Sequence, residues 1–484
     1  MNQFCKIFYC CSMAAITTPA NAQYLNSNTA NNTPQFPAKD SIGFVHIHQV
    51  RVTGNSKTKE FIILRELKLK QGDSIKNSDL DNELNISRQQ VYNTTLFNSV
   101  NISAIPASAG EIDIEVKVKE RWYIYPIPQF QIVDRNLNEW IKTHHTDLNR
   151  VNSGVKFVDF NLTGRRDQFR VSLLNGYNRN ISLLYIRPFC NASLTKGFSV
   201  GGGYAQNREV IFKTNYNNKT LSYNNGNFII KTYFARAGYN LRRAFKDRHL
   251  FNISYTYLTI TDSILGVSYN PKYLNTKTNS VDILDLSYTF QHVDLNNISY
   301  PLKGISGYIG VSKRGLGLTG GINMFSVEGG YNKYFDLKNN WYLGLQLMAK
   351  IKLPFEQPYI NQRAIGYGES YLRGLEYYVV DGVVYSVFKA TFKKKIIEFS
   401  IPVPFRIRAN RHPVLPFTIF AKTYTDAGYA FNKKAYDTWL NDKFLYTGGA
   451  GIDILALYDV NLRIEYSCNQ LGQKGLFLHV QGGF

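Results

Sequence analysis

Apolar and polar residues alternate one by one in many short segments after residue 120. In segment 284–290 the apolar positions are separated by Asp285, Ser287 and Thr289, and segment 341–349 has the same period. A period of two predicts β-strands with one apolar and one polar face. The polar face is too polar for the inside of a β-sandwich. The pattern therefore favours strands that have lipid on one side and water on the other.

The alternating segments are numerous enough to form a closed wall. They begin near residues 121, 153, 168, 180, 197, 228, 250, 282, 304, 322, 341, 383, 415, 446, 460 and 475. Sixteen is an even number, as antiparallel closure in a single-chain barrel requires. We therefore predict a mainly β protein whose residues 121–484 form a 16-stranded transmembrane antiparallel β-barrel in an outer membrane.

A different pattern precedes these segments and predicts a small α+β unit over residues 45–119. Its expected order is strand, helix, helix, strand, strand. The first strand is Val45–Thr53, and Thr58 and Ser78 are candidate N-caps for the two helices. The last strand alternates strictly over 112–118. A unit of this length lies near the lower limit for an independent core.

The first 42 residues are expected to lie outside both domains. Lys6, a short apolar run and the Ala-Asn-Ala sequence at 20–22 are typical of a secretory signal over residues 1–22. Residues 23–42 are rich in Asn, Thr, Ser and Pro, which predicts a flexible leader.

Composition narrows the possible partners. The chain of 484 residues has a formal net charge of +21, with 34 Tyr and 31 Phe. It contains no run of about 18 apolar residues, so no transmembrane helix is predicted. The basic residues are scattered among turns and strand ends. This scatter favours attraction to anionic lipid or lipopolysaccharide over binding of nucleic acid.

Residue spacing offers no arrangement for covalent or metal chemistry. The eight His residues show no ligand spacing, and Cys190 and Cys468 are far apart in the chain. The Gly-rich runs lack the following helix of a phosphate loop. We therefore expect no enzyme activity, no metal and no cofactor.

One long irregular stretch, at about 354–382, interrupts the alternation. Its segment 366–375 reads Gly-Tyr-Gly-Glu-Ser-Tyr-Leu-Arg-Gly-Leu. Long irregular loops in compact architectures are usually functional, and Gly lets them turn tightly. If the loop folds inward, Arg373 needs an acidic partner, and Asp426 at the end of a later strand supplies one.

These motifs together resemble the BamA/TamA-like superfamily of outer-membrane assembly factors and two-partner-secretion transporters. In that family a 16-stranded barrel follows one or more polypeptide-transport-associated (POTRA) domains. The resemblance maps the family's Arg-Gly-aromatic loop motif to Arg373 and Gly374, with Leu375 where the family prefers an aromatic residue. It maps the family's aromatic-x-Asp-x-Gly motif to Tyr424, Asp426 and Gly428.

The resemblance implies assembly of outer-membrane proteins or translocation of polypeptides. The POTRA domain would lie in the periplasm and accept an extended client segment along a sheet edge. The first and last strands would form a weak seam, because Gly482 and Gly483 before the terminal Phe484 have no side chains to pack. A single POTRA unit implies a specialised role.

The implied partners are unfolded outer-membrane or secreted polypeptides, with periplasmic chaperones or accessory lipoproteins and the lipid of the membrane itself. A passive porin or solute-uptake barrel is the alternative, and a surface adhesin is a third class.

Overall fold

The structure is a computed structural model that describes residues 43–481, except 109, 134–139, 141–144, 277, 317–321, 403–413, 434–437 and 457–459. The predicted signal and leader over 1–42 lie outside the described residues, as do Gly482, Gly483 and Phe484. Contacts divide the chain into two units, one up to Trp122 and one from Tyr123 onward, with residues 163–165 grouped in the first.

The first unit has the predicted strand–helix–helix–strand–strand order with one extra short strand. Its elements are β1 (Phe44–Thr53), α1 (Glu60–Leu64), β2 (Ser74–Lys76), α2 (Asn77–Tyr92), β3 (Phe97–Ser108) and β4 (Glu111–Glu120). The sheet order is β2-β1-β4-β3, with β1 and β4 parallel. Ile47, Ile62, Val91 and Ile114 are completely buried or nearly so. The helices and the sheet therefore share one small apolar core.

The predicted helix caps were wrong. The N-cap residues are Lys59 and Lys76, and neither makes a capping side-chain hydrogen bond. Because both helices pack on the sheet, burial of their apolar positions stabilises them without caps. None of the described helices is long and apolar enough to cross a membrane.

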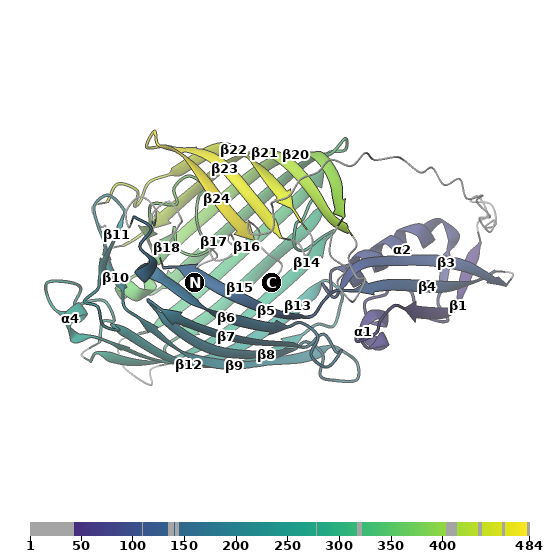
Figure 1. The fold of residues 1–484 in the computed structure, drawn as a ribbon, viewed down its shortest axis with the longest axis horizontal. Helices are drawn as coiled ribbons and strands as arrows, with labels where there is room; N and C mark the ends of the chain where they lie inside the picture. Colours follow the sequence, from purple (N-terminus) through teal and green to yellow (C-terminus); the bar gives the residue numbers. More distant parts are fainter. Residues whose placement is uncertain are drawn as a thin grey trace. The chain divides into compact units, whose positions relative to one another are not determined.

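The second unit is a 16-stranded antiparallel sheet. Each of its strands is hydrogen-bonded to the sheet strand that precedes or follows it in the chain (Figure 1). Its strands are β5 (Ile124–Ile132), β6 (Val151–Asp159), β7 (Gln168–Gly176), β8 (Arg179–Arg187), β9 (Lys196–Asn207), β12 (Ile230–Leu241), β13 (Asp247–Ile260), β14 (Ser280–Leu295), β15 (Gly304–Arg314), β16 (Met324–Asp336), β17 (Trp341–Leu353), β20 (Val384–Pro402), β21 (Val414–Phe431), β22 (Leu445–Leu455), β23 (Asn461–Asn469) and β24 (Lys474–Gln481). Each begins within three residues of its predicted start. The predicted fold class is confirmed.

The two faces of the wall differ as the alternation predicted. On β23, Tyr466 is exposed, whereas the neighbouring Glu465 and Ser467 are buried. On β21, Lys422 and Asp426 are buried on the same face as one another. The inner face is therefore polar and shielded, and the outer face carries the apolar side chains that suit lipid.

Two features of the wall are irregular. β20 and β21 pair over 18 residue pairs, but each shares only 11 with its other neighbour, β17 or β22. The second feature concerns the end strands β24 and β5, which we call the seam. Within the described part of the chain, no backbone pairing joins β24 to β5, whereas each of the other consecutive strands shares at least seven pairs.

Loops gather over one end of the wall (Figure 1). They contain β10 (Val210–Thr214), β11 (Thr220–Tyr223), α4 (Asp262–Leu265), β18 (Arg363–Ile365) and β19 (Val380–Asp381), with 3-10 turns at Leu148–Arg150 and Tyr359–Asn361. One buried cluster joins Val210, Ile264, Tyr273 and Tyr359, which come from three different loops. These loops therefore support one another across the opening.

Candidate functional site

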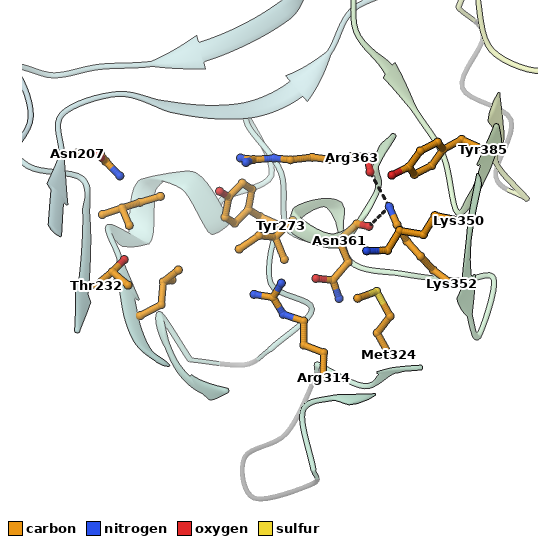
Figure 2. Close-up of a pocket in the computed structure, with 13 residues that line it drawn as sticks. Asn207, Thr232, Tyr273, Arg314, Met324, Lys350, Lys352, Asn361, Arg363 and Tyr385 are labelled. Atoms are coloured by element: carbon orange, nitrogen blue, oxygen red, sulfur yellow. Dashed lines mark hydrogen bonds between the residues drawn. The ribbon is translucent and has the colours of Figure 1, made fainter. Parts of the chain in front are cut away.

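The connection between β17 and β20, residues 354–383, runs inside the barrel; we call it the lumen loop. Its base is held by Lys352 at the end of β17. The Lys352 Nζ donates to the carbonyl oxygens of Asn361 and Arg363 at 2.9 and 2.6 Å (Figure 2). It also donates to the Gly382 carbonyl oxygen at 3.1 Å. Three bonds from one buried ammonium fix both ends of the loop against the wall.

A cavity of about 430 Å³ lies beside this base. Arg314, Lys350, Lys352 and Arg363 line it together with Asn207, Thr232, Tyr273 and Tyr385 (Figure 2). Within the loop, the Tyr367 hydroxyl donates to Asp381 at 2.8 Å, and burial raises the pKa of the Asp381 carboxyl. The loop is thus tied to itself as well as to the wall.

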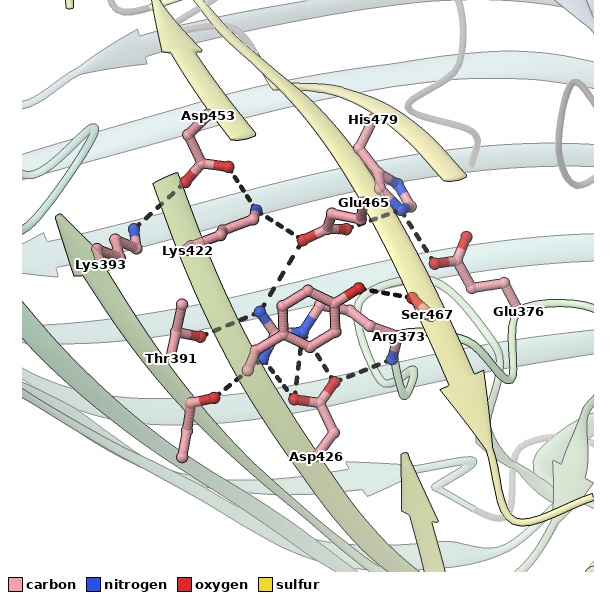
Figure 3. A network of polar contacts seen from close by, with 12 residues as sticks. Arg373, Glu376, Thr391, Lys393, Lys422, Asp426, Asp453, Glu465, Ser467 and His479 are labelled. Atoms are coloured by element: carbon pink, nitrogen blue, oxygen red, sulfur yellow. Dashed lines mark hydrogen bonds and ion pairs between the residues drawn. The ribbon is translucent and has the colours of Figure 1, made fainter. Parts of the chain in front are cut away.

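The tip of the lumen loop is attached to β21 through Arg373 and Asp426 (Figure 3). The backbone N–H and the Nε of Arg373 each donate to Asp426 Oδ2 at 2.9 Å, and the Arg373 Nη2 donates to Oδ1. Arg373 Nη1 also donates to Thr391 at 3.0 Å, and the guanidinium lies 4.0 Å from the Tyr424 ring centroid. Both charged side chains are buried. A two-pronged contact of this kind fixes orientation as well as position.

The residues next to Arg373 fit the same narrow space. Gly374 has φ +93°, and a Cβ there would lie 2.7 Å from the Ser467 Cβ. Only glycine satisfies both conditions. Leu375 is buried in an apolar cluster that includes Leu372 and Tyr378, so an aliphatic side chain fills the position where an aromatic one was expected. Gly428 lies beneath this cluster: a Cβ there would meet Leu372 at 3.1 Å.

A wider charge network surrounds the Arg373–Asp426 contact. Lys422 on β21 contacts Asp453 on β22 and lies 2.6 Å from Glu465 on β23. The Lys393 Nζ lies 3.5 Å from Asp453, and Arg373 lies 3.9 Å from Glu465. These buried charges compensate one another across four adjacent strands, as charges in a dry environment must. Sequence reasoning missed this network, although Lys422 and Asp426 share the polar face of their strand.

The loop tip also contacts the last two strands. Asn469 donates to the Gly374 carbonyl at 2.8 Å. Farther along, the His479 Nε2 lies 3.0 Å from Glu376 and 3.4 Å from Glu465 (Figure 3). These three residues have the side-chain types of a metal site, and their ligand atoms lie within 4.8 Å of one another. No spacing in the sequence indicated this group, because it forms only when the loop meets the wall.

A small α+β unit followed by a 16-stranded wall with an inward-folded loop defines the class. The chain has the fold of outer-membrane β-barrels that carry a periplasmic POTRA domain.

Comparison with known proteins is consistent with this class. Residues 45–121 match the POTRA family, described as surface antigen variable number repeat. The outer membrane protein assembly factor BamA of Nitratidesulfovibrio vulgaris is 33% identical over 78 residues, which are 16% of this chain and 9% of that protein. The match therefore spans about a tenth of that relative's length.

Two solved structures share the fold over most of this chain. BamA from Haemophilus ducreyi lacking POTRA domains 1–3 has a TM-score of 0.51 at 14% identity, and the alignment covers 90% of this chain and 84% of that one. CdiB from Escherichia coli has a TM-score of 0.53 at 12% identity, with 90% and 76% covered. The resemblance to the BamA/TamA-like superfamily is confirmed at the level of fold.

Proposed function

We propose that this protein inserts other β-barrels into the outer membrane or translocates polypeptides across it. The observation that carries the proposal is the seam, because β24 and β5 share no backbone pair in the described chain. A strand edge in lipid leaves N–H and C=O groups without partners, which is costly. A client strand that pairs with this edge satisfies those groups as it enters the membrane.

The POTRA unit offers a second place for an extended segment. β3 is a 12-residue strand at one end of its sheet and is paired there to β4 alone. Its other edge can accept a client by strand addition, with backbone hydrogen bonds giving affinity that depends little on sequence. The lumen loop, held by Arg373 and Asp426, would keep the inner side of the wall in shape while the seam opens.

The arrangement of the loops disfavours the porin alternative. The Asn218 side chain, between β10 and β11, donates to the Val379 carbonyl at 2.9 Å and contacts Asn441. Three loops are thus bonded to one another over the lumen, in addition to the apolar cluster described above. Such a cap opposes the steady current that a passive diffusion channel requires.

We further propose that the clients are a restricted set of outer-membrane or secreted polypeptides. One POTRA unit is described, and it offers fewer docking surfaces for chaperones or accessory lipoproteins than a chain of several units would. Outer-membrane phospholipid and lipopolysaccharide complete the environment, and the surplus of basic residues favours contact with their anionic groups.

Depletion of the protein followed by a census of outer-membrane and surface proteins tests the proposal. We expect loss of a defined subset of barrels or exported chains, restored by the wild-type gene and by Lys395→Ala. Arg373→Ala should restore it poorly. An unchanged census after depletion, together with steady large conductance of the purified protein, would refute the proposal in favour of a porin.

A further inference from the structure

His479 joins the seam strand β24 to the lumen loop. Its Nε2 lies 3.0 Å from Glu376 of the loop and 3.4 Å from Glu465 of β23. Ionised carboxylate oxygens only accept hydrogen bonds, so Nε2 carries the hydrogen in this contact. The side chains are 14%, 9% and 1% exposed, so little water competes with the bond.

Aromatic contacts reinforce the same connection. The Tyr371 ring stacks on His479 with centroids 5.8 Å apart, and the Tyr377 ring lies 5.6 Å from that of Phe477 on β24. Phe477 is buried. β24 is therefore held along one edge by β23 and from the inside by the lumen loop, while its other edge has no paired strand in the described chain.

The same contact reaches the anchor of the loop. Glu465 faces His479 with one oxygen and Lys422 with the other, and Arg373 lies 3.9 Å from it. Movement of His479 therefore changes the surroundings of Glu465, which lies beside Arg373. This geometry links the position of β24 to the position of the loop tip.

We propose that His479 is a positioning residue that latches β24 to the lumen loop, so that β24 moves away from the loop and widens the seam only when the His479–Glu376 contact breaks. The proposal rests on the proposed function, because it describes what holds β24, one side of the same seam, in place. In this proposal the His479 imidazole contacts Glu376 and Glu465 directly, and no metal ion lies between the three side chains. Lys422 and Arg373 already compensate Glu465, and their charges oppose a divalent cation placed beside them.

Single-channel recording of the full-length protein in planar bilayers tests the latch without any client. His479→Ala and Glu376→Gln should each raise the frequency of brief openings about tenfold, the size expected for one charge-assisted hydrogen bond. The double variant should open no more often than His479→Ala alone, since the alanine already removes the contact that Glu376→Gln weakens. His479→Gln keeps an N–H donor and should stay close to wild type.

The chain offers a matched control. His292 on β14 contacts Asp247 at 2.6 Å, so His292→Ala removes an imidazole–carboxylate contact of the same type on strands distant from the seam along the wall. It should leave the openings unchanged. If His479→Ala does not fold, a crosslink replaces it. Glu376→Cys and His479→Cys are combined in the mature chain, which lacks the three Cys of the predicted signal, with Cys190→Ser and Cys468→Ser. A short bifunctional thiol reagent then joins positions 376 and 479, which should abolish openings.

Three results would overturn the latch: unchanged openings in His479→Ala and Glu376→Gln, additive effects in the double variant, or openings that persist after crosslinking. Suppression of openings by zinc ions in the wild type but not in His479→Ala would also overturn it, in favour of a metal site. Client insertion by the wild type is measured separately. Its absence would count against the proposed function while leaving the conductance result on the latch intact.

Discussion

Replacing Asp426 with Asn tests whether the Arg373 ion pair holds the lumen loop. The substitution keeps the shape of the side chain but removes its charge. Arg373 is 8% exposed and Asp426 is fully buried, so the guanidinium would be left without its main partner in a dry environment. Loss of one member of a buried pair costs about 3–5 kcal/mol.

This cost can be measured as a change in local opening of the loop. An energy of about 3–5 kcal/mol corresponds to a ~10²–10⁴-fold faster exchange of protected amides. Hydrogen–deuterium exchange of the full-length protein in detergent should show this acceleration in residues 366–378. Strands β13 to β16 should be unchanged. Arg373→Ala should give an increase of the same order, because it leaves the fully buried Asp426 carboxylate without its main cation.

A surface ion pair provides the control. Lys395 and Glu398 lie 2.7 Å apart, but their side chains are 30% and 59% exposed. Such pairs contribute about 0–1 kcal/mol, so Lys395→Ala should change loop exchange very little. If Asp426→Asn behaves like Lys395→Ala, the ion pair does not hold the loop and the reasoning is refuted.

Three further predictions concern other parts of the chain. Gly374→Ala should loosen the loop tip, measured as faster proteolysis of the loop, because its Cβ would meet Ser467; Gly368→Ala, with φ +62° and open space, should have a smaller effect. Burial raises the pKa of Glu120, but hydrogen bonds from Ser56, Thr58 and Lys57 outweigh it and lower the pKa overall. The stability this gives is present above the unfolded-state pKa of about 4.3 and is lost as pH falls through the folded value. The free energy of unfolding of the POTRA unit, measured by denaturant unfolding, should therefore fall in acid, and Glu120→Gln should flatten that dependence. Ile114→Ala should destabilise the POTRA unit by about 2–5 kcal/mol in denaturant unfolding, whereas Ile105→Ala at an exposed position should cost far less; equal effects would contradict the assigned core.

The strands could be predicted because each carries its own signal. A segment such as 284–290 alternates within itself, so its existence and its two faces follow without knowledge of its neighbours. The POTRA helices followed from apolar periodicity, while the short β2 and the missing caps did not. Both depend on packing rather than on local sequence.

The charge network could not be predicted, because it depends on register. Lys422 meets Asp453 and Glu465 only when β21, β22 and β23 align as they do, and single-strand patterns do not specify that alignment. The approach of His479 to Glu376 also requires the path of an irregular loop. Arg373 and Asp426 were named together because a buried Arg needs an acid and because the two motifs resembled those of a family.

The unequal pairing of β20 and β21 has a practical consequence. β17 begins at Trp341, opposite Lys394, and β22 ends at Leu455, opposite Thr418. Beyond Glu398 and Thr418, β20 and β21 therefore continue as a ribbon paired only with each other within the described residues. This end of β20 is the one from which β5 also starts in the antiparallel order, which is the periplasmic side. A protease or an amide-modifying reagent confined to that compartment should attack the ribbon first, so it provides a natural reporter of which way the protein is oriented in reconstituted vesicles.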